Sequence, residues 1–141
     1  MAIHRMNFAD EVFFAKQVDY VDNVDAKMWV SALGKYAKNS ASPIMAVVDA
    51  SEVNRFCPTV VKLFAEALNL PNVRGIAIVT GDLMASQKAR VVGSLSEIEN
   101  IRIFSTTEDA QRFAQSRLHA PVGRRVGSAQ AFSTMRYAWV G

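Results

Sequence analysis

The stretch Pro43–Leu68, PIMAVVDASEVNRFCPTVVKLFAEAL, decides the fold class of this chain. Ile44–Val48 is a short apolar run between breakers, which predicts a buried central strand that ends on Asp49. We expect a short polar loop next, then a helix that begins near Pro58, where the missing N–H of proline costs nothing. The loop and the helix start then lie at the carboxyl edge of a sheet, where open α/β proteins usually bind ligands and partners.

The flanking segments extend this unit into an alternating α/β domain. Apolar periodicity and turn residues delimit each element. The predicted strands are Ile3–Phe8, Val12–Val21, Ile44–Val48, Gly75–Thr80 and Ile101–Phe104. The predicted helices are Val24–Lys38 with a cap at Asp22 or Asn23, one from Pro58 to Leu68, Leu83–Leu95, and one that opens with the capping-box pattern Ser105–Glu108 and ends at Leu118. Alternation after Ile44 predicts parallel strands, with an antiparallel edge added by the N-terminal strands.

Composition bounds the class of protein. The 141 residues, half of them apolar and 21% charged, fit one folded domain. The net charge of +3 is scattered and Arg124–Arg125 is the only basic doublet, so we do not expect nucleic-acid binding. No apolar run approaches the roughly 20 residues that span a membrane. One cysteine, Cys57, and an N-terminus without an apolar signal core predict a cytoplasmic protein.

The residues after the predicted domain have a different character. We divide the chain into a domain over residues 1–118 and a C-terminal extension over residues 119–141. The aromatic and Met side chains of the extension fit either a helix face or an alternating strand, and periodicity does not decide between them. We expect them to pack on the domain itself or, as the alternative, to form a homodimer contact. These residues are Phe132, Met135, Tyr137 and Trp139.

Few residues suit metal, cofactor or catalytic chemistry. The two histidines lie near opposite ends of the chain and there is one cysteine, so no metal site is expected. No phosphate-binding glycine motif is present, and no cofactor is expected. Cys57 is interpreted as a small apolar or capping residue rather than a nucleophile. Thr80, Gly81 and Asp82 follow a strand and open a helix, so they form a candidate anion site, although the negative Asp82 favours a capping role.

Asp49, Ser51 and Thr59 remain as polar residues around the central strand and the next helix. Asp and Ser side chains at such positions often close turns and caps, which is the preferred interpretation here. A phosphate on Thr59 would lie near the positive end of the helix dipole and would be stabilised there.

With these residues in place, the chain resembles the STAS family of anti-sigma-factor antagonist (SpoIIAA-like) domains over Val12–Leu118. Asp49-Ala50-Ser51 matches the family's Asp-x-Ser motif, and Ile101–Ala110 looks like its last strand and helix opening. The resemblance implies a single-domain SpoIIAA-like fold, with a mixed sheet of four or five strands in the order β-β-α-β-α-β-α-β-α. Where the family has Asp-Ser-Ser-Gly, this chain has Cys57-Pro58-Thr59-Val60, so proline stands at the usual phosphoacceptor position.

Three functions follow from these observations. The first is a non-enzymatic regulatory or protein-interaction module of SpoIIAA-like type with an unidentified protein partner. Its candidate interaction or switch loop consists of Asp49, Ser51, Phe56, Cys57 and Thr59. The alternative is a domain that binds a small apolar or anionic ligand at Phe56, Cys57 and Gly81-Asp82. A further alternative is a receiver-like phosphoacceptor with Asp49 and Thr80 at strand ends, although the acidic pair and lysine of receivers are missing.

Overall fold

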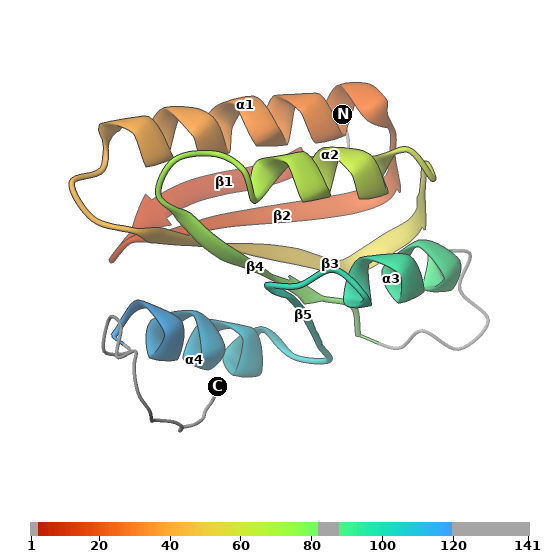
Figure 1. Cartoon of the computed structure of the whole chain (residues 1–141). Coiled ribbons are helices and arrows are strands. Elements are labelled where there is room, and N and C mark those ends of the chain that lie inside the picture. The colour runs from red at the N-terminus through yellow and green to blue at the C-terminus, as the bar shows by residue number, and fades with distance from the viewer. Residues whose placement is uncertain (1–2, 82–87, 120–141) are drawn as a thin grey trace.

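The computed structural model describes residues 3–81 and 88–119 as an α/β domain (Figure 1). Its elements alternate as predicted, with two strands first and a helix after each later strand. The strands are β1 (Ile3–Ala9), β2 (Val12–Val21), β3 (Ile44–Phe56), β4 (Val73–Val79) and β5 (Ile101–Phe104). The helices are α1 (Asn23–Asn39), α2 (Val60–Ala67), α3 (Ala89–Ser96) and α4 (Thr107–Leu118).

The five strands form one mixed sheet in the order β1-β2-β3-β4-β5. β1 is antiparallel to β2, and each of the other neighbouring pairs is parallel. The predicted sheet, with its antiparallel N-terminal edge, is therefore confirmed. The parallel order requires each crossover helix to lie on a face of the sheet, which buries the central strands on both sides.

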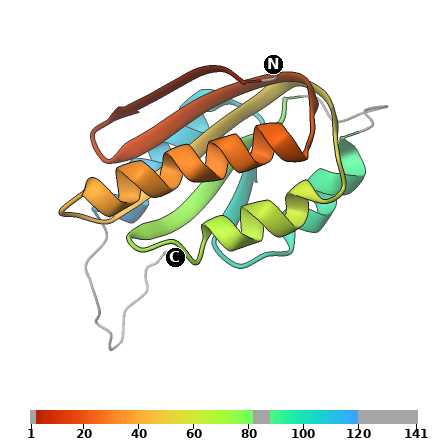
Figure 2. The ribbon, with the colours of Figure 1, turned by 90° about the horizontal axis from the view of Figure 1, so that it is seen from above.

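Helices α1, α2 and α3 cover one face of the sheet, and α4 covers the other (Figures 1 and 2). α1 begins with a capping box in which Asp22 and Asp25 each accept a backbone N–H of the other. Its buried face carries Trp29 and Leu33 at helical spacing. On the other face, Ala110 and Ala114 let α4 approach the sheet closely.

Two buried polar groups interrupt the core beneath α1. The side-chain amide of Gln17 and the indole N–H of Trp29 are buried, and neither finds a hydrogen-bond partner among the described residues. A buried polar group without a partner costs about 1–3 kcal/mol of stability. These two groups therefore lower the stability of the fold, and an apolar replacement of similar shape would increase the free energy of unfolding.

β3 does not end at Asp49, so the predicted polar loop after it is wrong. The strand continues to Phe56 and pairs with the second half of β2, from Val18↔Glu52 to Val21↔Phe56. Its buried residues after Asp49 are Ala50, Val53 and Phe56, and the polar residues between them face solvent. Two register shifts against β2 break the two-residue alternation, and this broken period made a strand look like a loop.

Smaller differences concern the element ends. The cap of α4 is Thr106, whose side chain accepts the N–H of Asp109, and not the predicted Ser105. α3 is described from Ala89, so the predicted helix start at residues 83–88 lies partly outside the described residues. The predicted packing of residues 120–141, and the boundary of the extension, also lie outside them.

Candidate functional site

A two-stranded ribbon projects from the sheet and holds most of the predicted site residues. Within the described chain, β4 pairs with β3 only as far as Asp49↔Val79, and β1 pairs with β2 only as far as Ile3↔Gln17. Beyond these points β2 and β3 pair with each other, and we call residues 18–21 and 50–56 the ribbon. Its parallel strands lead directly into α1 and α2 (Figure 1).

The inner face of the ribbon belongs to the hydrophobic core. Val21, Val53 and Phe56 are at most 2% exposed, and Phe56 contacts Phe64 of α2 edge-on with ring centroids 6.3 Å apart. The prediction that Phe56 contributes to an interaction surface is therefore wrong, because its side chain is inaccessible to a partner. Phe56 instead anchors the ribbon beneath α2.

The outer face of the ribbon is exposed and carries charged and aromatic side chains. Tyr20 is 41% exposed, and the guanidinium of Arg55 lies 4.2 Å from its ring centroid. Lys16 and Glu52 form a salt bridge with 2.7 Å between Nζ and Oε2. This ion pair raises the pKa of Lys16, first through its hydrogen bond to Glu52 and then through the charge of Glu52.

Asp49 and Ser51 form a local polar contact within β3, at the base of the ribbon. One carboxylate oxygen of Asp49 accepts hydrogen bonds from the backbone N–H of Ser51 at 3.0 Å and from its hydroxyl at 2.7 Å. The contact is local, as the turn-closure interpretation expects, but the chain continues as a strand and does not turn here.

Lys88 is buried beside Asp49 and Ser51 at the base of the ribbon. It is 2% exposed, and its ammonium donates to the carbonyl oxygens of Ala50 at 2.7 Å and Ser51 at 3.3 Å. Burial lowers the pKa of Lys88, and the nearby charge of Asp49 opposes that shift. The amino group thus ties the chain before α3 to the base of the ribbon.

The candidate anion site is only partly within the described residues. Thr80 is 2% exposed, its backbone N–H donates to the carbonyl of Phe104, and its hydroxyl lies 3.4 Å from the same carbonyl oxygen. Gly81 has a φ of 63°, and a Cβ built there would lie 3.4 Å from the Cβ of Ser51. Asp82 lies outside the described residues. The N–H and hydroxyl donors of Thr80 are therefore directed at backbone carbonyls rather than toward an anion.

A second polar cluster lies at the far end of the ribbon, where α1 and α2 begin. The Sγ of Cys57 is 3.2 Å from the hydroxyl of Thr59, and that hydroxyl donates to the side-chain oxygen of Asn23. Tyr20 lies close enough to Cys57 that the two side chains perturb each other's acidity. These contacts link the ends of β2 and β3 to the starts of both helices.

The hydrogen bonds perturb two acidities in this cluster. The pKa of the Cys57 thiol is lowered, mainly by the Thr59 hydroxyl, with smaller contributions from the Thr59 backbone and the Tyr20 hydroxyl. The pKa of Tyr20 is raised, mainly by its hydrogen bond to Cys57 and then by desolvation. The lowered pKa gives Cys57 a larger thiolate fraction at a given pH than an unperturbed thiol has.

The five residues of the predicted loop therefore occupy three different places. Asp49 and Ser51 lie at the base of the ribbon, Cys57 and Thr59 lie at its far end, and Phe56 lies in the core. Eight residues of extended chain span about 26 Å, so a single small ligand does not reach both ends.

Sequence reasoning missed the partners that complete each cluster. Tyr20 and Asn23 belong to the Cys57 cluster, and Lys16 and Lys88 to the Asp49 cluster. The parallel pairing of β2 with β3 is the feature that could have identified Tyr20, because it places Tyr20 opposite Arg55. For Lys88, the sequence indicated only that a charged residue interrupts an apolar row, and it did not indicate the carbonyl partners of that residue.

Within residues 3–81 and 88–119, no group of His, Cys, Asp or Glu side chains is arranged to hold a metal ion. No helix in this part of the chain is both long and apolar enough to cross a membrane.

Comparison with known proteins identifies the fold. Neither a family model nor a curated protein matches the sequence. Among solved structures, an anti-sigma factor antagonist from Mycobacterium paratuberculosis is similar with a TM-score of 0.60 and 20% identity, over 79% of this chain and 92% of that one. SpoIIAA in its unphosphorylated form gives a TM-score of 0.54 at 10% identity, over 82% and 98%.

A third structure, an uncharacterized protein from Shewanella loihica with a SpoIIAA-like fold, gives a TM-score of 0.52 at 17% identity, over 80% and 92%. The chain therefore has the SpoIIAA-like fold that its resemblance to STAS domains implied, at a low level of sequence identity.

Proposed function

We propose that this protein is a non-enzymatic regulatory module that binds a protein partner through the outer face of the ribbon and the start of α2. The contact surface consists of Tyr20, Glu52, Arg55, Cys57 and Thr59. It retains Cys57 and Thr59 of the predicted interaction loop, leaves out Asp49 and Ser51 at the base of the ribbon, and adds the ribbon residues Tyr20, Glu52 and Arg55. Two of the similar structures are an anti-sigma factor antagonist and SpoIIAA, and a protein-binding role fits that likeness.

The exposed pair of Tyr20 and Arg55 is the observation that supports this proposal most. Tyrosine and arginine are enriched among residues that dominate binding energy at protein interfaces. Here the guanidinium is already stacked on the ring at 4.2 Å, so little side-chain freedom is lost on binding. The core residues on the inner face of the ribbon hold its backbone in place.

Thr59 gives this surface a residue that accepts modification. Proline at position 58 has no hydroxyl, whereas the Thr59 side chain is exposed. A phosphate there would break the hydrogen bond to Asn23 and place negative charge at the start of α2. Regulation through Thr59 is therefore compatible with the surface, and a constitutive surface needs no such step.

The experiment is affinity capture from the native lysate with the tagged full-length chain. Tyr20→Ala and Arg55→Ala should each lower recovery of the bound partner about tenfold, as expected when an interface hot spot is removed. Arg112→Ala, on the exposed side of α4, is the matched control and should leave recovery unchanged.

Circular dichroism checks that each variant is folded. Recovery of the same proteins in the same amounts by all variants would exclude the ribbon as the contact surface. Thr59→Glu tests regulation separately, because a change with this variant alone implies a charge-sensitive surface.

The structure provides little support for the two alternative functions. The small-ligand hypothesis relied on Phe56, whose side chain is buried in the core. The receiver-like hypothesis relied on Asp49 at a strand end, but β3 continues seven residues beyond Asp49 to Phe56. We therefore keep protein binding as the single proposal.

A further inference from the structure

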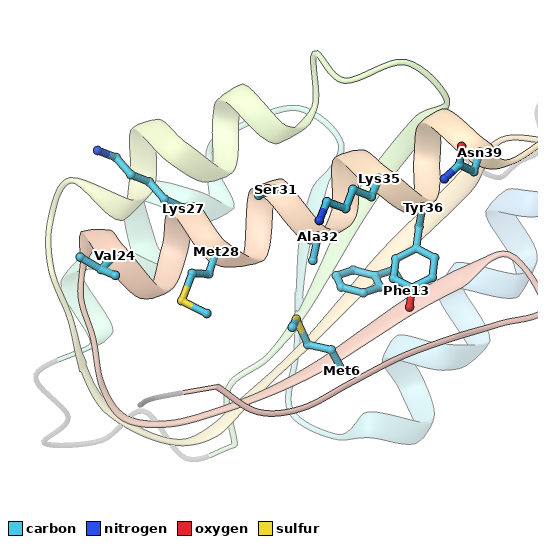
Figure 3. Close-up of a pocket in the computed structure, with 10 residues that line it drawn as sticks. All are labelled: Met6, Phe13, Val24, Lys27, Met28, Ser31, Ala32, Lys35, Tyr36 and Asn39. Carbon is cyan, nitrogen blue, oxygen red and sulfur yellow. The ribbon is translucent and has the colours of Figure 1, made fainter.

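A groove between α1 and the edge strand β1 extends from the start of α1 along its length and serves none of the roles described so far. It has a volume of about 710 Å³ and lies between the exposed flank of α1 and the sheet (Figure 3). Five large apolar side chains are exposed in the described part of the chain, and four of them line this groove: Met6, Val24, Met28 and Tyr36. Apolar exposure in the molecule is thus concentrated at one place, which is typical of a binding surface.

One end of the groove is built from stacked aromatic rings. The Tyr36 ring stacks on Phe8 with centroids 4.9 Å apart, and it contacts Phe13 at 5.2 Å. Toward the other end, Met28 projects from α1 toward the sheet, and Met6 lies on β1 facing it (Figure 3). Flexible methionines beside a fixed aromatic end allow the groove to accept apolar side chains of several shapes.

The groove runs beside an unpaired strand edge. β1 pairs with β2 on one side, and within the described residues no strand pairs with its other side. A free strand edge offers a row of backbone donors and acceptors to an incoming strand. Met6 and Phe8 face the α1 side of the sheet, while Arg5 lies over Phe14 on the opposite face. An added strand would alternate its side chains between these two faces.

The charges around the groove are one-sided. Lys27 and Lys35 line it, and Arg5 lies on the exposed strand. β1 contains no carboxylate, and the one carboxylate of α1, Asp25, is buried in the capping box. The first acidic residues after β1 lie in the turn beyond its end, at positions 10 and 11. The two walls therefore present cations without exposed anions.

We propose that this groove binds an extended, acidic segment of a partner protein, which adds to the free edge of β1 as a further antiparallel or parallel strand. Alternate apolar residues of the segment enter the groove against Met6, Met28 and Tyr36. The intervening acidic residues meet Arg5 on the opposite face, and those at the ends of the segment meet Lys27 and Lys35. A bound helix would fill the groove but leave the backbone groups of β1 without strand partners.

The same charges disfavour two other occupants. A second copy joined edge to edge through β1 would bring two sets of Arg5, Lys27 and Lys35 together, which is repulsive. Residues 120–141 of this chain carry three arginines and no acidic residue, so they lack the complementary charge.

The test is fluorescence polarisation with the full-length chain and a labelled peptide in which about eight residues, a usual strand length, alternate Val or Phe with Glu and a further Glu stands at each end. Saturable binding that weakens as salt rises from about 50 to about 300 mM is expected, because the charge contribution is screened. A peptide of the same composition with its apolar residues in one block should bind about tenfold more weakly, since it no longer matches the two-residue period. A peptide that is N-methylated at alternate residues should also lose affinity, because it cannot complete the strand pairing.

Protein variants locate the site. The double variant Lys27→Glu/Lys35→Glu and the single variant Met28→Glu should each weaken binding about tenfold. Lys62→Glu, an exposed charge reversal on α2, is the matched control and should leave affinity unchanged. The ribbon variant Tyr20→Ala should also leave it unchanged, so failure here is distinguishable from failure of the proposed function.

Three results would overturn the proposal. They are the absence of saturable binding to the alternating peptide, equal binding of the block peptide, and loss of binding with Lys62→Glu but not with Lys27→Glu/Lys35→Glu. Dimerisation that Met28→Glu abolishes would assign the groove to a second copy. Binding of anionic vesicles without binding of the peptide would assign it to a lipid surface.

Discussion

At the scale of single residues, the environment of Cys57 has the most direct consequence. Its Sγ lies 3.2 Å from the Thr59 hydroxyl, and the neighbouring Thr59 and Tyr20 side chains lower the pKa of the thiol. A thiol of lowered pKa reacts faster at a given pH below that pKa, because more of it is ionised. The pKa of this cysteine should therefore change when its contacts at the far end of the ribbon change.

Thr59→Val should raise the pKa of Cys57, because it removes the side chain that contributes most to lowering it. The measurement is the rate of alkylation by iodoacetamide as a function of pH, and the midpoint of that profile should move to higher pH. Thr59→Ser retains the hydroxyl and should leave the midpoint near that of the natural chain. Identical profiles for all three chains would show that the hydroxyl does not act on the thiol.

Residue identity alone predicted part of this cluster. Cys57 and Thr59 were singled out because they stand where a helix begins after a strand. Tyr20 and Asn23 were missed because they belong to a segment more than 30 residues away, which only the parallel pairing of β2 with β3 brings near. Lys88 was missed for a similar reason, since its partners are carbonyl groups of a distant strand.

At the scale of elements, two glycines show how differently the same residue is used. Gly75 lies in β4, where an added Cβ would be 3.0 Å from the carbonyl oxygen of Asn100 and 3.3 Å from Met45. Gly93 lies within α3, and no described atom is within 4 Å of a Cβ placed there. The first position requires the absence of a side chain, whereas the second does not.

Gly93→Ala should stabilise the protein by about 0.5–1 kcal/mol, because alanine loses less conformational freedom than glycine in a helix. Gly75→Ala should destabilise it by about 1–3 kcal/mol, because a backbone carbonyl must shift to admit the methyl group. Urea unfolding followed by circular dichroism gives both free energies. A stabilised Gly75→Ala variant would mean that β4 and the chain before β5 separate easily.

Elements with a clear period were predicted well, and those with a broken period were not. α1 has an uninterrupted apolar stripe, and its predicted bounds differ from the observed ones by one residue at each end. The second half of β3 was taken for a loop because register shifts against β2 place its buried residues three apart instead of two. Such shifts depend on the neighbouring strand, so the local sequence does not reveal them.

At the scale of the whole molecule, the predicted surfaces face different directions. The ribbon surface lies at the end of the sheet where α1 and α2 begin, and the groove lies along the β1 edge (Figures 1 and 3). The two surfaces use different residues and adjoin at the start of α1, where Val24 lines the groove and Asn23 bonds Thr59. The proposed homodimer contact through Phe132, Met135, Tyr137 and Trp139 is a third, separate prediction.

Deletion of Gly127–Gly141 should lower the mass measured by light scattering from that of a dimer to that of a monomer. Apolar and aromatic side chains of this kind contribute most of the burial in subunit contacts. Trp139→Ala within the full chain is the smaller perturbation and should weaken the dimer without shortening the chain. A natural chain that is already monomeric would remove the dimer contact from consideration.

The parallel pairing of β2 with β3 has one more consequence, which concerns the electrostatic potential near Thr59. Because the two strands leave the sheet in the same direction, α1 and α2 begin side by side, joined by the hydrogen bond between Thr59 and Asn23. The start of α1 is neutralised by Asp22 and Asp25. The start of α2 has no acidic residue in its first turn, and the side chain of its cap residue Thr59 makes no capping hydrogen bond. No side chain of the first turn or the cap thus neutralises the positive end of that helix dipole. A partner with a carboxylate or phosphate at this end would gain an attraction that comes from the backbone itself, and exchanging side chains around it would not remove that attraction.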